Sequence, residues 1–511
     1  PRLAVCAPAA YGPPFTQCAR FARCVKPQGG SPLPDTNKKY ATLVNNTILF
    51  AISNFSSKIV SLFIQPYLTY ALESPDVLGV TRLMQSVTNL LIPVVSLGVS
   101  FAVIRFGLDK EKDKASVFMN GLATILTGFT VMVLAWPAVR LIPNAANYLV
   151  LLYLCVLASC LRTLCTQFIR ARMCNRLVAV DGVLTTASLL GFYLLFLSVL
   201  DMGATGYLLA LFCSDICSAL FVFIAGGCAR FFDLHKFDKA LWREMLRYCM
   251  PMIPASISFW VINASDTFYV QAMCEGIDGR SAEAWVGLLG TGYYLPQIIT
   301  FVGQFFYEAW QLSAVTEEEN REAFFSKIFR VYASVLLCCA AGIIWLCRPM
   351  MHLFRADYYE AWQFVPFLVL ASTITCLNNF LNSVYVVYKR SSSSLYTMLA
   401  GAVLNLVLNY LFILWLGPVG VTSASFLSLL LVFLLRARST RSLLVIDFQA
   451  GRMLVQLGLI LIEIAVLFYV DAWVLPTTLL TAVVCLLNAR EVLSMAQKLL
   501  GMVGGRLRKK G

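Results

Sequence analysis

The sequence is poor in charge and almost lacks histidine. Only 13% of its 511 residues are Asp, Glu, Lys or Arg, whereas a soluble chain of this length carries roughly 25%. Too little polar surface is therefore present to cover a water-soluble globule. The two histidines, His235 and His352, leave little material for histidine-based metal sites or acid–base chemistry. These shortages argue against a soluble protein and against histidine-dependent catalysis.

Two further patterns are missing. The sequence holds no phosphate loop of the form G-x-x-x-x-G-K-[ST], which argues against an ATP-driven pump. Its 17 cysteines lie mostly inside apolar stretches and show no zinc-site spacing, and disulfide frameworks belong to small secreted domains. In lipid, cysteine behaves as a small apolar residue. We therefore expect no metal, no cofactor and no catalytic residue.

Apolar residues, by contrast, make up 59% of the chain and come in long blocks. A block of about 20 apolar residues is long enough to cross a bilayer as a helix. The sequence therefore predicts an all-α polytopic membrane protein with about 14 transmembrane helices. The predicted spans are 44–69, 78–104, 116–138, 147–169, 177–200, 204–226, 249–273, 284–311, 328–347, 361–387, 394–415, 418–435, 454–470 and 473–488.

The formal net charge of +13 invites a nucleic-acid interpretation, which the distribution of the charges contradicts. Basic residues stand singly or in small groups beside apolar blocks, as they do in cytoplasmic loops of membrane proteins. Alternate loops are basic, which predicts that both termini are cytoplasmic. The predicted inner loops include Lys110, Lys112, Lys114, Arg170, Arg172, Arg176, Arg230, Lys236, Lys239, Arg243, Arg247, Arg436, Arg438 and Arg452.

A faint internal repeat indicates two halves of six helices. An offset of 208 residues brings residues 73–79 to the stretch near 282–288 and pairs Gly79 with Gly287. Six is an even number, so the halves would share one orientation and be related by an axis along the membrane normal. The predicted divisions are a disordered leader or gene-model artefact at 1–37, lobes at 38–230 and 231–440, two further helices at 441–492, and a basic cytoplasmic tail at 493–511.

Several stretches resemble a known family. They are SNFSSK at 53–58, DVLG at 76–79, SLGVSFAVIRF at 96–106, MPMIPASISFWVINASDTFYV at 250–270, GTGYYLPQIITFVGQFFYEAWQLSA at 290–314 and LNLVLNYLFILWLGPVGVTSASFLSLL at 404–430. Residues 40 to about 440 are similar to the polysaccharide transporters, the Wzx-type O-antigen flippases of the multidrug/oligosaccharidyl-lipid/polysaccharide exporter superfamily. In many relatives an Asp-Arg pair lies in the seventh span, whereas here Thr267 follows Asp266.

The resemblance implies both a fold and a function. The fold has two pseudo-symmetric six-helix lobes around a central cavity, with two additional C-terminal helices. The function is translocation of polyprenyl-pyrophosphate-linked oligosaccharide from the inner to the outer leaflet of the bacterial cytoplasmic membrane by alternating access. The implied partners are this lipid-linked substrate, membrane lipids, and a polysaccharide polymerase and glycosyltransferases.

Four basic residues in the predicted spans are candidates for binding the pyrophosphate in the cavity: Lys58, Arg82, Arg105 and Arg162. An ionisable side chain in a span is costly and faces a cavity or a partner. Lys58 lies near the middle of the first span, too deep for full snorkelling. Its alternative role is a structural ion pair, and the offset of 208 makes Asp266 the candidate partner. Arg82 and Arg105, near the ends of the second span, alternatively sit at the membrane interface.

Three acidic residues, Asp266, Asp215 and Glu308, are candidates for binding a coupling ion or for pairing with the buried bases. A carboxyl in low dielectric can titrate and so bind a proton or cation. Pairing is the simpler alternative. Arg162, deep in the fourth span, needs either such a partner or a wet pocket.

Other functions remain open on the sequence alone. A cation-coupled multidrug antiporter of the related MATE family typically has twelve spans, and the apolar blocks after residue 450 suggest fourteen. A lipid II or spore-wall precursor flippase of the same superfamily is hardly separable from the first hypothesis. A membrane glycosyltransferase or polymerase usually needs a large outer loop, whereas the longest here is about 272–283.

Overall fold

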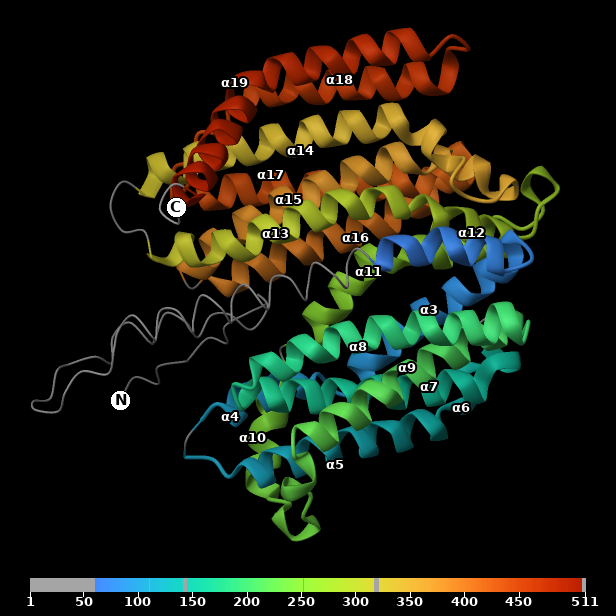
Figure 1. The fold of residues 1–511 in the computed structure, drawn as a ribbon, viewed down its shortest axis with the longest axis vertical. Coiled ribbons are helices and arrows are strands. Elements are labelled where there is room, and N and C mark those ends of the chain that lie inside the picture. Colours follow the sequence, from blue (N-terminus) through green and yellow to red (C-terminus); the bar gives the residue numbers. More distant parts are fainter. Residues whose placement is uncertain are drawn as a thin grey trace, which may run out of the picture. The chain divides into compact units, whose positions relative to one another are not determined.

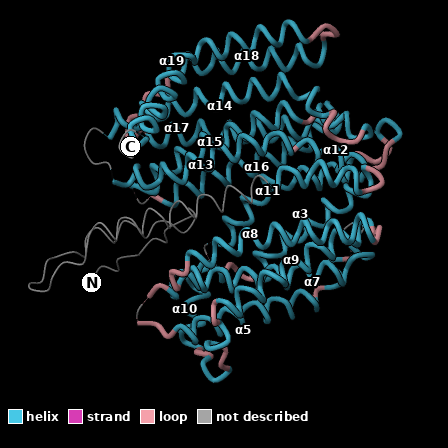
Figure 2. The backbone as a smooth tube through the Cα atoms, in the orientation of Figure 1, coloured by secondary structure: helices cyan, strands magenta, loops and turns pink. Residues whose placement is uncertain are grey.

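The computed structural model describes residues 60–109, 111–140, 145–250, 252–316, 321–388 and 390–507. Within these ranges every regular element is a helix and no strand occurs (Figure 1; Figure 2). The prediction of an all-α fold is therefore confirmed. The predicted leader at 1–37 and the candidate Lys58 lie outside the described residues.

The described chain forms two compact units, one ending at Gly290 and the other beginning at Thr291. The lobe boundary expected near residue 230 stays a prediction. After a stretch of helix at 60–71, the helices of the first unit are α3 (Pro75–Val95), α4 (Val99–Gly107), α5 (Lys114–Leu134), α6 (Trp136–Val139), α7 (Ala145–Ala171), α8 (Asn175–Tyr193), η1 (Leu194–Val199), α9 (Gly203–Ala225), η2 (Cys228–Phe231), η3 (Leu234–Lys236), α10 (Lys239–Cys249), α11 (Met252–Met273), η4 (Ile277–Gly279) and α12 (Ala282–Gly292).

The second predicted span, 78–104, is divided into α3 and α4. The chain breaks because Leu97 (φ 46°) and Gly98 (φ 64°) adopt left-handed backbone conformations. This region is unusual for a residue with a side chain, so the surrounding packing must hold Leu97 there. The neighbouring Val95 and Val99 are buried in the core of the first unit, and the Cys249 thiol donates to the Gly98 carbonyl at 3.3 Å.

The core of the first unit brings together α3, α4, α5, α7, α9 and α10. Phe118 and Phe168 both belong to it, with ring centroids 4.9 Å apart. Helices in a membrane gain little from leaving lipid, because lipid tails are as apolar as the side chains. Close van der Waals packing and interhelical hydrogen bonds therefore stabilise this core.

The second unit is built from seven further α-helices. They are α13 (Tyr294–Thr316), α14 (Arg321–Met351), α15 (Val365–Val387), α16 (Ser391–Leu416), α17 (Gly420–Thr440), α18 (Ala450–Tyr469) and α19 (Val474–Leu507), with the short turns η5 (Ala356–Gln363) and η6 (Gly417–Val419). Its core is aromatic: the rings of Trp310 and Phe380 stack at 4.7 Å, and the Trp310 indole donates to Ser383.

Helices α18 and α19 form a pair at the end of the chain (Figure 1). Arg452, expected in an inner loop, lies in the first turn of α18. Its guanidinium donates to both carboxylate oxygens of Glu491 on α19, at 2.6 and 2.9 Å. This bidentate contact fixes the two helices side by side.

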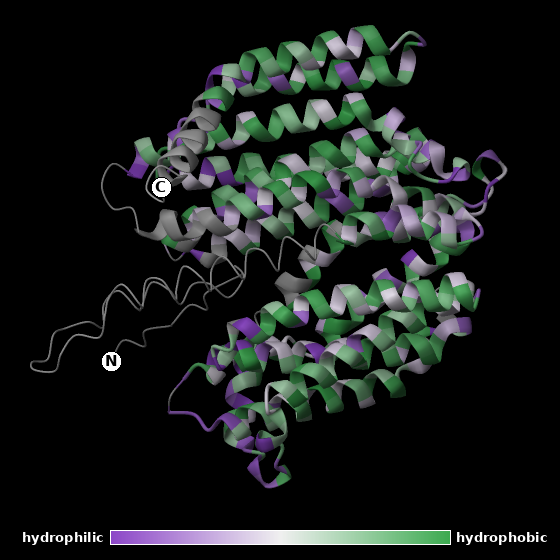
Figure 3. Ribbon diagram, viewed as in Figure 1, coloured by the Kyte–Doolittle hydropathy of each residue, from purple (hydrophilic) through white to green (hydrophobic). Residues whose placement is uncertain are grey.

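Ten helical stretches among the described residues are long and apolar enough to cross a membrane. One of them, Ser393–Thr440, covers both α16 and α17, and two others cover α18 and the first part of α19. Figure 3 shows hydrophobic residues along the helices and hydrophilic residues gathered in the connections at their ends. The count of fourteen spans stays a prediction.

Candidate functional site

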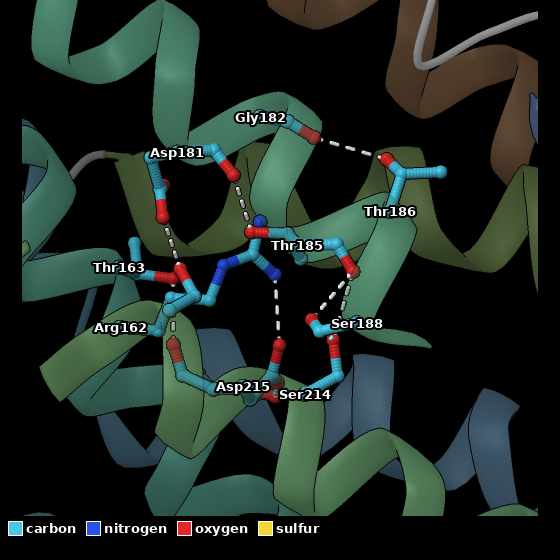
Figure 4. Close-up of polar contacts among 11 residues, drawn as sticks. Arg162, Thr163, Asp181, Gly182, Thr185, Thr186, Ser188, Ser214 and Asp215 are labelled. Atoms are coloured by element: carbon cyan, nitrogen blue, oxygen red, sulfur yellow. Dashed lines mark hydrogen bonds and ion pairs between the residues drawn. The ribbon is translucent and has the colours of Figure 1, made fainter. Parts of the chain in front are cut away.

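Arg162 and Asp215 form an ion pair inside the first unit (Figure 4). Nη1 of Arg162 on α7 lies 2.8 Å from Oδ1 of Asp215 on α9. Ser159, almost one turn before Arg162, donates its hydroxyl to the other carboxylate oxygen. The Asp215 side chain is 16% exposed and that of Arg162 is 37% exposed. Two of the residues singled out in the sequence therefore neutralise each other, and both oxygens of Asp215 are occupied.

A second carboxylate, Asp181, lies in the same network and was missed in the sequence. It stands on α8, is 2% exposed, and accepts a hydrogen bond of 2.5 Å from Ser218 on α9. Ser218 follows Asp215 by three residues, so both groups face the same side of α9. Arg162 lies close enough to act on Asp181 electrostatically. Asp181 comes only five residues after the basic Arg176, so from sequence it resembled a residue at a helix end.

Hydroxyl groups join α8 to α9 beside these charges. Ser188 and Ser214 lie 3.1 Å apart, and each donates to the carbonyl of Thr185 at 3.0 Å. Thr185 itself donates to the carbonyl of Asp181. Interhelical hydrogen bonds of this kind hold membrane helices together. The network of α7, α8 and α9 therefore contains one ion pair, a second carboxylate held by Ser218, and hydroxyls that bridge α8 and α9, which suits a rigid element.

Arg82 has different surroundings. It lies on α3, and its guanidinium donates to the side-chain oxygens of Gln65 and, at 3.2 Å, of Gln85. Tyr207 on α9 donates to the same Gln85 oxygen at 2.9 Å. No ion pair among the described residues includes Arg82, and its buried Nε has no partner there. Neutral amides therefore hold this cation in position without cancelling its charge.

The remaining candidates are placed separately. Arg105 lies in the last turn of α4 with its side chain exposed. Asp266 is completely buried in α11. Glu308 belongs to α13, but its side chain lies outside the described part of the structure, as does Lys58. The structure thus brings Arg162 and Asp215 together and records no contact of Arg82 or Arg105 with that pair.

One basic residue that was expected in an inner loop, Arg436, lies inside the second unit. Arg436 belongs to α17 and is only 3% exposed. Its guanidinium donates to Thr397 and Ser394 on α16, both at 3.2 Å, and to the Asn378 carbonyl on α15 at 2.8 Å. Arg436 therefore ties three helices together. In the part of the chain that is described, no three His, Cys, Asp or Glu side chains gather to hold a metal ion.

Residues 43–308 match the family model described as "Polysaccharide biosynthesis protein". No curated protein matches the chain. Among solved structures, the lipid II flippase MurJ in an inward closed conformation has 15% identity and a TM-score of 0.66, covering 86% of this chain and 98% of its own. A multidrug resistance MATE transporter in an inward-facing conformation has 15% identity and a TM-score of 0.57, covering 76% and 95%. A MOP superfamily transporter from Pyrococcus furiosus has 14% identity and a TM-score of 0.51, covering 78% and 94%. At identities this low, the structural matches show a common fold and nothing further.

Proposed function

The chain belongs to the polysaccharide biosynthesis protein family, and we propose that this multi-pass membrane transporter is a flippase for polyprenyl-pyrophosphate-linked oligosaccharide. The flippase moves the glycolipid from the inner to the outer leaflet by alternating access. We propose that it resides in the bacterial cytoplasmic membrane with both termini in the cytoplasm, where glycosyltransferases supply the glycan. A polymerase on the other side is the expected consumer.

The observation that supports an anionic substrate is the environment of Arg82. A cation inside a span is expensive unless something offsets its charge. Among the described residues, its guanidinium donates hydrogen bonds only to neutral oxygens, those of Gln65 and Gln85. A pyrophosphate is an anion that an arginine binds with bidentate hydrogen bonds. We propose that Arg82, with Lys58 and Arg105, attracts the pyrophosphate, while the polyprenyl tail stays in lipid.

The Arg162–Asp215 pair leads us to a narrower role for Arg162. Because Asp215 neutralises it, Arg162 offers less attraction to an anion than Arg82 does. We propose that the pair, together with Asp181, holds α7, α8 and α9 in register. Asp266 and Glu308 remain our candidates for binding a coupling ion.

One second candidate has a specific observation in its favour. MurJ, described as a lipid II flippase, is matched over 98% of its length with a TM-score of 0.66. Lipid II also carries a polyprenyl pyrophosphate, so the same Arg82 chemistry would serve it. The two candidate substrates differ in the headgroup attached to the pyrophosphate. A transport assay with each lipid therefore distinguishes the two functions.

The deciding experiment is a flipping assay with the full chain in vesicles. Wild type, Arg82→Gln, Lys58→Ala and the control Arg438→Gln are compared at equal amounts of folded protein. We expect wild type and control to flip a pyrophosphate-linked oligosaccharide lipid, and Arg82→Gln to lose at least about 10-fold in rate, which corresponds to one charge-assisted contact. Arg438 is exposed on α17, so Arg438→Gln removes the same charge at a site in the second unit.

Each other outcome overturns part of the proposal. Transport of lipid II in preference to the oligosaccharide lipid would favour the second candidate. Expulsion of a cationic dye with no lipid flipping would identify a cation-coupled multidrug antiporter. Full activity of Arg82→Gln would remove Arg82 from the anion's path.

A further inference from the structure

Residues 228–250, which we call the connector segment, join α9 to α11 in the first unit. The segment comprises the turns η2 and η3 and the amphipathic helix α10. On α10, Leu241, Met245 and Cys249 are buried in the core of the unit. They recur every four residues and so form one face of the helix. Figure 1 draws α10 beside the end of α4 and the start of α5.

The connector segment is held to the helices at several points. The Asn120 amide on α5 donates to the Asp238 carbonyl at 3.1 Å and accepts from the Asp238 N–H at 3.2 Å. The Trp242 indole donates to Thr124 at 2.9 Å. At the other end the Arg172 guanidinium lies 4.8 Å from the ring centre of Phe231. The connector segment is therefore held against the helices in one fixed orientation.

These contacts indicate that α10 crosses α4 and α5 instead of running alongside them. Asp238 meets Asn120, six residues from the start of α5, which is about 9 Å along that helix. Cys249 meets Gly98, nine residues before the end of α4, which is about 14 Å along it. Between these points α10 descends by only about 5 Å although its own length is about 16 Å.

The outer side of the connector segment exposes large apolar side chains. Phe232 is 50% exposed, Leu234 is 72% exposed and Phe237 is 44% exposed. Exposing each of these side chains to water is unfavourable, because transfer of apolar surface out of water lowers the free energy. At the boundary of headgroups and acyl chains, burial of the same side chains is favourable, and a basic polar face beside them is typical of such segments.

The connector segment carries five Lys and Arg side chains against three acidic ones. Its three acids are engaged: Asp233 accepts from the His235 N–H, Asp238 caps the start of α10, and Glu244 pairs with Lys112 at 2.8 Å. Lys236 lies 3.5 Å from Asp113. No ion pair within the described residues includes the remaining exposed cations, which are Arg230, Lys239, Arg243 and Arg247.

We propose that the connector segment is an interfacial anchor that binds anionic phospholipid headgroups of the adjacent leaflet. Phe232, Leu234 and Phe237 enter the boundary of headgroups and acyl chains. The four unpaired cations contact lipid phosphates, whose attraction acts within a Debye length of the surface. The anchor requires a membrane-spanning chain but no particular transported substrate, so its failure and a failed flipping assay are separate results.

Hydrogen–deuterium exchange tests the proposal on the full chain in nanodiscs. Discs of phosphatidylcholine are compared with discs that also contain phosphatidylglycerol. We expect amides of residues 228–238 in wild type to exchange about 5-fold more slowly, or slower still, with the anionic lipid, and high salt to remove the difference. Arg243→Gln/Arg247→Gln should lose most of this protection. The control Lys327→Gln, an exposed lysine on α14 in the second unit, should keep it.

A second variant tests the apolar part. Phe232→Ser/Leu234→Ser/Phe237→Ser removes only exposed side chains, so the core contacts of α10 remain. We expect its segment to exchange faster than wild type in both lipids. Equal exchange of wild type in the two lipids, or full protection retained by the double arginine variant, would overturn the proposal. Protection produced only by an added cytosolic protein would assign the surface to a protein partner and overturn it as well.

Discussion

Gly79 on α3 and Gly287 on α12 lie against each other where these two helices meet. A Cβ built on Gly287 would stand 3.2 Å from the backbone nitrogen of Gly79 and 2.1 Å from the Pro75 carbonyl oxygen. A Cβ on Gly79 would stand 1.8 Å from the Glu283 carbonyl oxygen. The contact is reciprocal, because Pro75 and Glu283 each precede their glycine by four residues. Reciprocal contacts of this kind are what a two-fold relation produces.

The absence of both side chains lets α3 and α12 approach at this point. We predict that Gly79→Leu and Gly287→Leu each destabilise the protein by about 2 kcal/mol, because the backbones must move apart to admit a side chain. Gly182→Ala on α8 is the control: nothing lies within 4 Å of its new Cβ, and we expect an unchanged or slightly higher melting temperature. Thermal unfolding of the purified variants measures this. Equal melting temperatures for Gly79→Leu and wild type would show that the helices separate freely.

The ion pair between Arg162 and Asp215 gives a second prediction. Removing either partner leaves a partly buried charge without its counterion. We expect Asp215→Asn and Arg162→Gln each to cost about 2 kcal/mol, less than a fully buried pair, because the Arg162 side chain is 37% exposed. The double variant should cost clearly less than the sum of the two. A double-mutant cycle by thermal or denaturant unfolding measures the coupling. Additive losses would mean that the two charges do not interact.

The network around Arg162 shows what sequence can and cannot predict. Both charges of the pair lie well inside long apolar stretches, where a charge is conspicuous, so Arg162 and Asp215 were predicted as candidates. Their mutual contact depends on the packing of α7 against α9, which no local pattern encodes. Asp181 was missed because a carboxylate close to a basic loop resembles a helix end, and its hydrogen-bond donor Ser218 lies 37 residues away in the sequence.

Arg436 illustrates the same limit in the second unit. Together with Arg438, it was expected in an inner loop, since basic residues beside an apolar block are typical of cytoplasmic ends. The structure continues α17 to Thr440 and turns Arg436 inward, while Arg438 remains exposed. They stand two positions apart, and on a helix residues two apart face different sides. The sequence pattern predicts the end of a span but not which of two arginines will be buried.

These two arginines should therefore differ strongly in their effect on stability. Arg436→Ala removes hydrogen bonds to Thr397, Ser394 and the Asn378 carbonyl and leaves a void among three helices. We predict a loss of about 3 kcal/mol. Arg438→Ala should stay within about 0.5 kcal/mol of wild type. Unfolding in detergent, followed by intrinsic fluorescence, compares them. Similar losses for both variants would refute the structural role of Arg436.

The pair between Lys112 and Glu244 predicts a pH dependence. The hydrogen bond to Glu244 raises the pKa of Lys112 above its ordinary value of 10.5. A lysine with a raised pKa in the folded state stabilises that state below its ordinary pKa and loses the contribution as pH rises through the raised value. The melting temperature of wild type minus that of Lys112→Gln should therefore be small, positive and constant from pH 7 to 9. A difference that vanishes within that range would show that the contact is not made.

The last prediction concerns the geometry at Arg82. Its planar guanidinium reaches Gln65 and Gln85 at once, and Tyr207 holds Gln85 from the other side. A lysine at this position keeps the charge but presents an ammonium that lacks the fixed fork of donors. If charge alone draws in the anion, Arg82→Lys should transport at the wild-type rate while Arg82→Gln is nearly inactive. If the arrangement matters, as the two glutamine contacts lead us to expect, Arg82→Lys should fall to about a tenth of the wild-type rate, which corresponds to the loss of one charge-assisted hydrogen bond. Tyr207→Phe separates the two effects further, because it leaves the charge of Arg82 unchanged and removes the hydrogen bond from Tyr207 to Gln85. We expect Tyr207→Phe to slow transport several-fold. Its free energy of unfolding should fall by no more than about 1 kcal/mol, the contribution of one hydrogen bond.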